Sequence, residues 1–482
     1  MNIGARSEDD RGAAAGAEEG VEERVRRAAE QAMAGTVSDL CRLVRIPSVS
    51  WSAFDPAHVA ASADAVAGML RETGLFDTVE VDRAPLADSA DDAESLGQPA
   101  VLARRAARHG RPTVLLYAHH DVQPPGKDED WQSPPFEPVV RGDRLYGRGA
   151  ADDKAGVMTH VASLRALAAT FGDDLDLGLA VFIEGEEEFG SRSFASFLAR
   201  HRDDLAADAI IVADSDNWST EVPALTVSLR GNVTFKLTVR TLEHASHSGM
   251  FGGAAPDAML ALVRLLASLH DEDGSVAVQG LTASEGEVPE KTEEELRADA
   301  ALLDGVRPVG TGPVLARLWS KPAITVTGID APSVATASNT LLPAVSARVS
   351  CRVAPGQSAR EAFEALERHL RARAPFGAHL EFEDVDTGDP FLVDTDGWAV
   401  EEIERAMTDA WGAEPVRAGI GGSIPFISDL VREFPGAQIL VTGVEDPDTR
   451  AHSPNESLHL GVFARAIRTE SLFLARLDAR GE

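Results

Sequence analysis

The stretch TVLLYAHHDVQP, residues 113–124, places two histidines and an aspartate directly after an apolar run. The run has the length and composition of a buried strand, so we expect His119, His120 and Asp121 at its carboxyl end. Side chains two residues apart share one face of a strand, so His119 and Asp121 point together and His120 points away. Because a metal-bound imidazole usually needs a carboxylate or carbonyl to orient it, the alternation favours His119 with Asp121 as the functional pair. It leaves His120 as packing or a surface contact.

The chain around this strand predicts an α/β fold. Apolar strands alternate with helical segments, which is typical of a mainly parallel sheet flanked by helices. Near residue 227 the pattern changes to long strands with polar alternation, and the helix–strand pattern returns near 393. We therefore expect one domain from residues 21–226 and 393–482, and a smaller inserted α+β domain from 227–392. Residues 1–20, rich in glycine, alanine and acidic residues, are expected to be disordered.

The composition excludes several classes of partner. The 482 residues include 45 Lys and Arg against 78 Asp and Glu, a net charge of −33, which argues against binding nucleic acid or an anionic membrane surface. Cys41 and Cys351 are too far apart in sequence for a disulfide framework, which fits a reducing compartment. We find no secretory signal and no apolar stretch of about 18 residues or more, so we expect a cytoplasmic protein that does not cross a membrane.

Polar clusters follow several of the predicted strands. They are HHD at 119–121, YGRGAADDKAG at 146–156, EGEEEFGS at 184–191, ADSDNW at 213–218 and TRAHSPNES at 449–457. Each cluster alone is more simply read as a solvated loop, but five of them at strand ends are harder to explain by chance. The carboxyl ends of parallel strands meet at one edge of a sheet, so these side chains are expected to converge. Histidine and carboxylate ligands together predict a metal site suited to Zn²⁺ or Mn²⁺.

Three other kinds of site are not indicated. The chain contains no HExxH motif of a helix-borne zinc protease. It also contains no GxSxG elbow, which argues against an α/β-hydrolase. The glycine-rich segment at 146–156 lacks the GxxxxGK[ST] spacing of a phosphate-binding loop.

Taken in order, the motifs resemble those of the M20 metallopeptidases, specifically the cytosolic dipeptidase branch that includes carnosine- and Cys-Gly-hydrolysing enzymes. The resemblance runs from IPSVS at 46–50 to the final HSPNE. It rests on YAHHDVQP, LYGRGAADDK, EGEEEFGS, IVAD, SLRG, HSGMFGG, GGSIP and AHSPNE. It implies a catalytic α/β domain with a dinuclear metal site and an inserted lid domain that dimerises. The acidic stretch 271–304 is longer than the simplest lid of this family.

The resemblance also implies the ligands of two divalent metal ions, Zn²⁺ or Mn²⁺. One ion would be held by Asp152, Glu188 and His452, and the other by His119, Asp152 and Asp214. Asp216 is a nearby rival of Asp214, but Asp214 directly ends the apolar strand and keeps the family's distance to SLRG.

Other positions match the family's catalytic and substrate-binding residues. Asp121 would orient the site, and Glu187 would be the general base. His247 in HSGMFGG would reach the active site of the neighbouring subunit of a homodimer formed through the lid. The carboxylate end of the substrate would be bound by Thr340, Arg352, Gly422 and Ser423. A guanidinium suits this task because its planar fork pairs with a carboxylate through two hydrogen bonds.

The resemblance therefore implies hydrolysis of dipeptides, or of very short peptides with a free C-terminal carboxylate, by a bridging water that Glu187 activates. An alternative within the same superfamily is an N-acyl amino acid deacylase, such as a desuccinylase or an acetylornithine deacetylase. A third possibility is a non-catalytic relative that serves as a binding or scaffold protein. This last reading is disfavoured because every ligand and base position holds a chemically competent residue.

Overall fold

The strand β3 (Thr113–His119), which contains the apolar run, lies inside a nine-stranded sheet, and all of its side chains are buried. In spatial order the strands are β1 (Thr78–Asp82), β2 (Ala100–Arg105), β6 (Gly178–Glu184), β3, β7 (Ala209–Ala213), β17 (Gln438–Thr442), β8 (Ala224–Leu229) and β15 (Phe391–Leu392), with β16 (Val416–Ile420) beside β8. The four central strands β6, β3, β7 and β17 run parallel, and antiparallel pairs occur toward the edges. This computed structural model describes residues 20–86, 95–286, 288–422 and 425–479.

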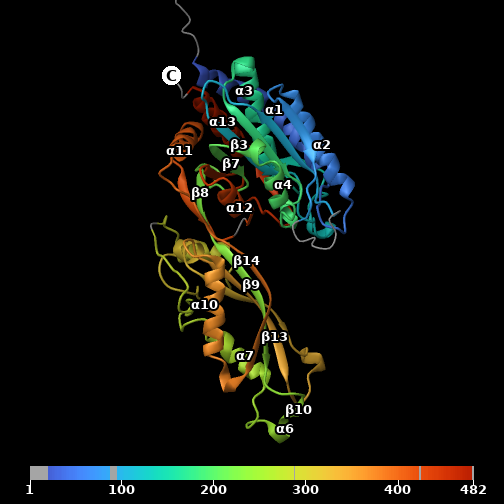
Figure 1. Ribbon diagram of the computed structural model, residues 1–482, viewed down its shortest axis with the longest axis vertical. Coiled ribbons are helices and arrows are strands. Elements are labelled where there is room, and N and C mark those ends of the chain that lie inside the picture. The colour runs from blue at the N-terminus through green and yellow to red at the C-terminus, as the bar shows by residue number, and fades with distance from the viewer. Residues whose placement is uncertain (1–19, 87–94, 287, 423–424, 480–482) are drawn as a thin grey trace, which may run out of the picture.

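Helices cover both faces of the large sheet (Figure 1). On one face α1 (Val21–Val44), α3 (Lys154–Phe171) and α13 (Leu460–Ala479) pack against one another, and α11 (Trp398–Trp411) packs against α13. On the other face lie α4 (Phe194–Arg200) and α12 (Pro425–Glu433), whose Phe194 and Phe426 contact the Tyr117 ring of β3. The predicted α/β class with a mainly parallel sheet flanked by helices is therefore confirmed.

A small three-stranded sheet brings together two segments that are far apart in sequence. It consists of β4 (Val139–Arg141), β5 (Arg144–Tyr146) and β18 (Ser457–His459). Ser457 pairs with Tyr146, so the loop before β18 and the loop after β5 lie next to each other. This pairing places the AHSPNE segment beside the GRGAADDK segment.

A second, smaller body has a hydrophobic core of its own and lies below the large sheet in Figure 1. Its four-stranded antiparallel sheet contains, in order, β11 (Ala323–Asp330), β13 (Ala344–Val353), β9 (Gly231–Arg240) and β14 (His379–Gly388). The helices α7 (Ala258–Ala267) and α10 (Ala359–Ala372) pack on this sheet. At the far tip lie the two-stranded pair β10 (Ser246–His247) and β12 (Thr340–Leu341) and the short helix α6 (Ser248–Phe251).

The chain passes between the two bodies at two adjacent points. It leaves the large sheet after β8 and enters β9 at Gly231, and it returns after β14 to β15. The two crossings nearly touch, because a Cβ atom on Gly231 would lie 2.7 Å from the carbonyl oxygen of Gly388. They lie close to the boundaries expected at 226–227 and 392–393, while the division of the chain into two domains stays a prediction.

Two expectations concern the chain as a whole. The expected disorder of residues 1–20 falls, except for Gly20, outside the described residues. The helices of the described residues include none with the length and hydrophobicity that a membrane span requires.

Candidate metal centre

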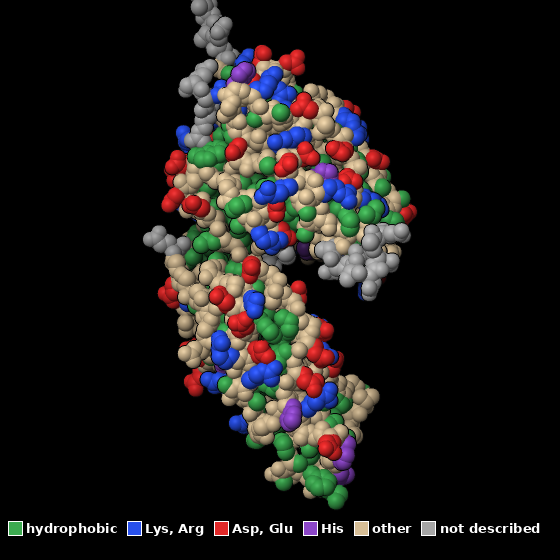
Figure 2. Space-filling model, in the orientation of Figure 1, with side chains coloured by type: hydrophobic (Ala, Val, Ile, Leu, Met, Phe, Trp, Pro, Cys, Tyr) green, Lys and Arg blue, Asp and Glu red, His purple; other side chains and the backbone are tan. Residues whose placement is uncertain are grey.

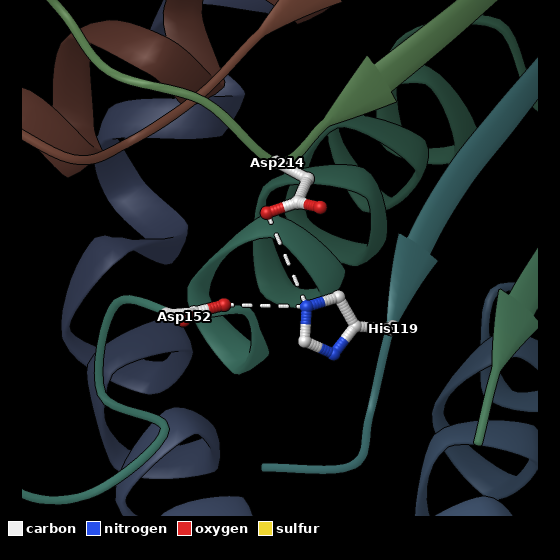
Figure 3. Close-up of side chains that lie close together, drawn as sticks. All are labelled: His119, Asp152 and Asp214. Atoms are coloured by element: carbon white, nitrogen blue, oxygen red, sulfur yellow. Dashed lines mark ion pairs between the residues drawn. The ribbon is translucent and has the colours of Figure 1, made fainter. Parts of the chain in front are cut away.

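Histidine and carboxylate side chains converge where the central parallel strands end. His119 is the last residue of β3, and Asp214 follows β7 directly. Asp152 lies two residues before α3, Glu188 lies in the turn after β6, and His452 lies in the loop before β18. Figure 3 shows His119, Asp152 and Asp214 pointing toward one another from three separate segments. The predicted convergence of polar clusters at the strand ends therefore occurs.

Asp152 lies between two histidines and presents one oxygen to each. Its Oδ1 is 3.2 Å from Nε2 of His119, and its Oδ2 is 2.9 Å from Nε2 of His452. Asp214 Oδ1 approaches the same His119 nitrogen at 4.0 Å, and Glu188 Oε2 lies 3.3 Å from the His452 nitrogen. His119 is 1% exposed, whereas the His452 side chain is 58% exposed, so the cluster opens to solvent on the His452 side.

These side chains form two sets of three possible ligands that share Asp152. The sets are His119, Asp152 and Asp214, and Asp152, Glu188 and His452. In each set the ligand atoms all lie within 4.8 Å of one another. They are the same two sets that the family resemblance implies. Asp216, the rival of Asp214, is exposed and belongs to neither set.

The residues present fit a pair of divalent metal ions. The donors are imidazole nitrogens and carboxylate oxygens, which Zn²⁺ and Mn²⁺ both accept. Within the described part of the chain, the buried Oε1 atom of Glu188 has no hydrogen-bond partner, so a lone pair remains for a cation. Several carboxylates buried together are costly unless positive charge compensates them, and bound metal ions supply that charge.

Burial and the neighbouring charges shift the pKa values of the carboxyl groups in the cluster. Burial raises the pKa of Glu188 to about 11, and the negative charge of Asp152 adds to the effect. Burial also raises the pKa of Asp214, to about 6, and that of Glu187 well above its usual range. Burial by itself would raise the pKa of Asp152, but hydrogen bonds from His119 and His452 outweigh it and lower the pKa. Asp152 is therefore the carboxylate best stabilised in its charged form.

Asp121 connects the end of β3 to the turn that carries the glutamates. Its carboxylate accepts hydrogen bonds from the backbone N–H groups of Glu187 (3.1 Å) and Glu188 (3.2 Å) and from the Ser50 hydroxyl (2.7 Å). Nδ1 of His119 lies 3.1 Å from the Asp121 carbonyl oxygen and 3.3 Å from Oδ1, so Nε2 faces Asp152. Asp121 thus contacts both His119 and the turn that carries the glutamates, while its orienting role stays a prediction.

His120 is packed inside the protein. It is fully buried, and its Nε2 lies 2.9 Å from the carbonyl oxygen of Pro99. Its backbone N–H donates to the carbonyl of Glu184 in the neighbouring strand. Burial lowers the pKa of His120 to about 4, so the ring is neutral at pH 7. Of the two interpretations of His120 that the alternation allows, packing is correct and a surface contact is wrong.

Sequence reasoning missed the role of Glu456, the last residue of AHSPNE. The carboxylate is fully buried and accepts four hydrogen bonds. The donors are the Arg148 guanidinium at 2.6 Å and the backbone N–H groups of Gly149 (3.2 Å), Ala151 (3.0 Å) and Asp152 (3.2 Å). Glu456 therefore fixes the backbone that presents Asp152. In the sequence this pairing is indicated only by Glu456 in AHSPNE and Arg148 in LYGRGAADDK, two charged residues that have no predicted role as ligand or base.

The predicted substrate-binding residues lie in several places. His247 is exposed at the far tip of the small body, where it pairs with Thr340 across β10 and β12 (Figure 1). Arg352 lies on β13 opposite Asn232, and Gly422 follows β16. Ser423 lies outside the described residues. The structure thus groups the predicted metal ligands and places His247 and Thr340 far from them in the same chain.

Comparison with known proteins defines the class of protein. Residues 115–476 match peptidase family M20/M25/M40, and the chain belongs to this family, which confirms the resemblance. It is 38% identical over 414 residues to the cysteinylglycine-S-conjugate dipeptidase of Corynebacterium striatum, covering 85% of this chain and 88% of the relative. It is 27% identical over 452 residues to the Cys-Gly metallodipeptidase dug1 of Schizosaccharomyces pombe, covering 90% and 93% of the two chains.

Solved structures share the fold. The dipeptidase Dug1p from Saccharomyces cerevisiae aligns with a TM-score of 0.76 at 23% identity, covering 96% of this chain and 99% of that one. Human carnosine dipeptidase 1 aligns with a TM-score of 0.71 at 24% identity, covering 96% and 99%. At 23% and 24% identity these two alignments show that the chain shares the fold and no more than that.

Replacing Glu456 tests its role in holding Asp152. We expect Glu456→Gln to weaken metal binding by about 10–100-fold, because a single amide oxygen replaces the carboxylate that serves four donors. Zinc titration of the metal-stripped protein against a competing chelator measures this. Glu470→Gln is the matched control, since Glu470 is also buried but pairs with His160 at 2.8 Å outside the cluster. Equal losses of zinc affinity in the two variants would contradict the assignment.

Substitutions of the two adjacent histidines test whether His119 binds metal while His120 only packs. We expect His119→Ala to abolish measurable hydrolysis and to reduce bound metal from about two ions to about one per chain, because one ligand set loses its only imidazole. His120→Leu removes the hydrogen bond to Pro99, so we expect it to lower the free energy of unfolding by about 1–2 kcal/mol with both metals retained. Metal analysis and urea unfolding measure these effects. Equal loss of bound metal from both variants would contradict the assignment of His119, and not His120, as a metal ligand.

Proposed function

We propose that this protein is a metal-dependent dipeptidase that hydrolyses dipeptides or very short peptides with a free C-terminal carboxylate. The observation that carries the proposal is the pair of ligand sets sharing Asp152, in a chain that belongs to a peptidase family. The relatives described above are dipeptidases, so the alternative of an N-acyl amino acid deacylase is not favoured. A non-catalytic role is disfavoured because both ligand sets are complete.

His119, Asp152 and Asp214 would hold one metal ion, and Asp152, Glu188 and His452 would hold the other. Zn²⁺ and Mn²⁺ are the proposed ions, because both accept nitrogen and carboxylate donors. Divalent ions at such a site lower the pKa of water and polarise the carbonyl group that is attacked. Glu456 and Arg148 would keep Asp152 in place while the substrate binds.

Glu187 is the proposed general base. Its Oε2 lies 4.0 Å from Nε2 of His119, and its backbone N–H donates a hydrogen bond to the Asp121 carboxylate. In the proposed reaction Glu187 removes a proton from the attacking water as the new C–O bond forms. It then donates this proton to the leaving amine nitrogen as the peptide C–N bond breaks. Both proton transfers thus use one carboxylate.

We also propose that Arg352, with Thr340, Gly422 and Ser423, binds the carboxylate of the substrate, and that His247 acts on the active site of a second subunit. The position of His247 supports a role in trans, because it lies at the tip of the small body, far from the metal ligands of its own chain (Figure 1). Figure 2 shows hydrophobic side chains and histidines gathered at this tip, where Met250 is 75% exposed. The homodimer and the cytoplasmic location stay predictions.

A substrate panel tests the proposed function. Metal-stripped protein supplied with Zn²⁺ or Mn²⁺ is expected to hydrolyse dipeptides such as Ala-Gly and to leave N-acetyl and N-succinyl amino acids intact. We expect Glu187→Gln to lower kcat by about 10²–10⁴-fold, because the general base is lost while every metal ligand remains. Metal analysis of this variant is the control. Cleavage of the acylated amino acids alone would establish the deacylase, and no cleavage of either class would exclude an enzyme of this kind.

A further inference from the structure

A pocket of about 340 Å³ is lined by residues of both bodies. The large body contributes Asp216, Trp218 and Gly421, and the small body contributes Lys291, Leu315 and Trp319. Asp216 lies two residues after the ligand Asp214, and Gly421 precedes the predicted carboxylate-binding Gly422. The Asp216 carboxylate is close enough to repel the charges of Asp214 and Asp152, so this edge of the pocket lies near the candidate metal centre.

Two tryptophans line this pocket and contact each other. The rings of Trp218 and Trp319 meet edge to face, with centroids 6.4 Å apart and an interplanar angle of 77°. Trp218 lies in the segment that follows β7, and Trp319 is the last residue of α9 (Val314–Trp319). Trp319 packs tightly on β16, because a Cβ atom on Gly419 would lie 2.8 Å from the Cβ of Trp319. The small body thus holds one aromatic ring of the pocket against the large sheet.

The rest of the wall contains apolar side chains from α9 and β16 and polar ones at Asp216, Asn217 and Thr226. Leu315 is buried and Leu318 is exposed, and both come from α9. Lys291 is paired with Asp299, with Nζ 2.5 Å from Oδ2, so its charge is already compensated. A cavity of this size accommodates a phenyl or benzyl group, and aromatic walls favour aromatic guests.

We propose that the pocket formed by Trp218 and Trp319 receives a large apolar side chain of the dipeptide and so gives the enzyme a preference for bulky over small substrates. The inference rests on the proposed dipeptidase function. It assigns substrate selection to α9 of the small body, whose Trp319 reaches the large body although it is remote from the metal ligands in sequence.

The test compares Phe-Gly, Gly-Phe and Ala-Gly as substrates of the full-length, metal-loaded protein. We expect the wild type to show a kcat/KM at least about tenfold higher for one phenylalanine dipeptide than for Ala-Gly, because filling an apolar pocket favours the larger side chain. Whichever phenylalanine dipeptide is preferred identifies the substrate residue that enters the pocket. In Trp319→Ala and Trp218→Ala we expect this kcat/KM to fall by about 10–100-fold, while that for Ala-Gly changes less than about threefold.

Two further variants separate selectivity from folding. Trp319→Phe keeps an aromatic wall and is expected to retain the preference. Trp411→Ala removes a part-buried tryptophan of α11 outside the pocket and is expected to leave the ratio of the two kcat/KM values unchanged. If Trp319→Ala does not fold, the part-exposed Trp218 decides the question alone.

Equal losses for large and small substrates in the pocket variants, or a wild type that cleaves Ala-Gly as well as both phenylalanine dipeptides, would overturn the pocket proposal and leave the dipeptidase in place. Failure to cleave any dipeptide would instead refute the proposed function.

Discussion

The position of the Asp152 carboxylate is the constraint on which the candidate site depends. Its two oxygens face His119 at the end of β3 and His452 in the loop before β18. Because it belongs to both ligand sets, both depend on the rigidity of the backbone before α3. The buried carboxylate of Glu456 provides this rigidity by accepting hydrogen bonds from that backbone and from Arg148. The pairing of β18 with β5 brings Glu456 to the required place.

Part of this site could be predicted from the sequence because strand geometry is local. Alternation along β3 separates His119 from His120, and the family motifs identify both ligand sets. Alternation could not tell whether His120 is packed or exposed, since that depends on Pro99 and on a neighbouring strand. For Glu456 the sequence shows only the acidic residue and a possible partner, Arg148, because its other three donors are backbone N–H groups that leave no mark in the sequence.

The arrangement of the two bodies could also be predicted only in part from the sequence. The change in hydrophobic pattern near 227 and 393 reflects the two places where the chain passes from one sheet to the other. The pattern does not indicate that α9, which follows the acidic stretch, packs its Trp319 against Gly419 of the large body. Such contacts join segments far apart in sequence, so the clustering of the candidate ligands was predictable while the pocket formed with α9 was not.

A crystal structure of the zinc-loaded protein, with an anomalous difference map recorded at the zinc absorption edge, tests directly whether two metal ions share Asp152. We expect two peaks, one near His119, Asp152 and Asp214 and the other near Asp152, Glu188 and His452. A single peak, or two peaks that do not share Asp152, would contradict this expectation.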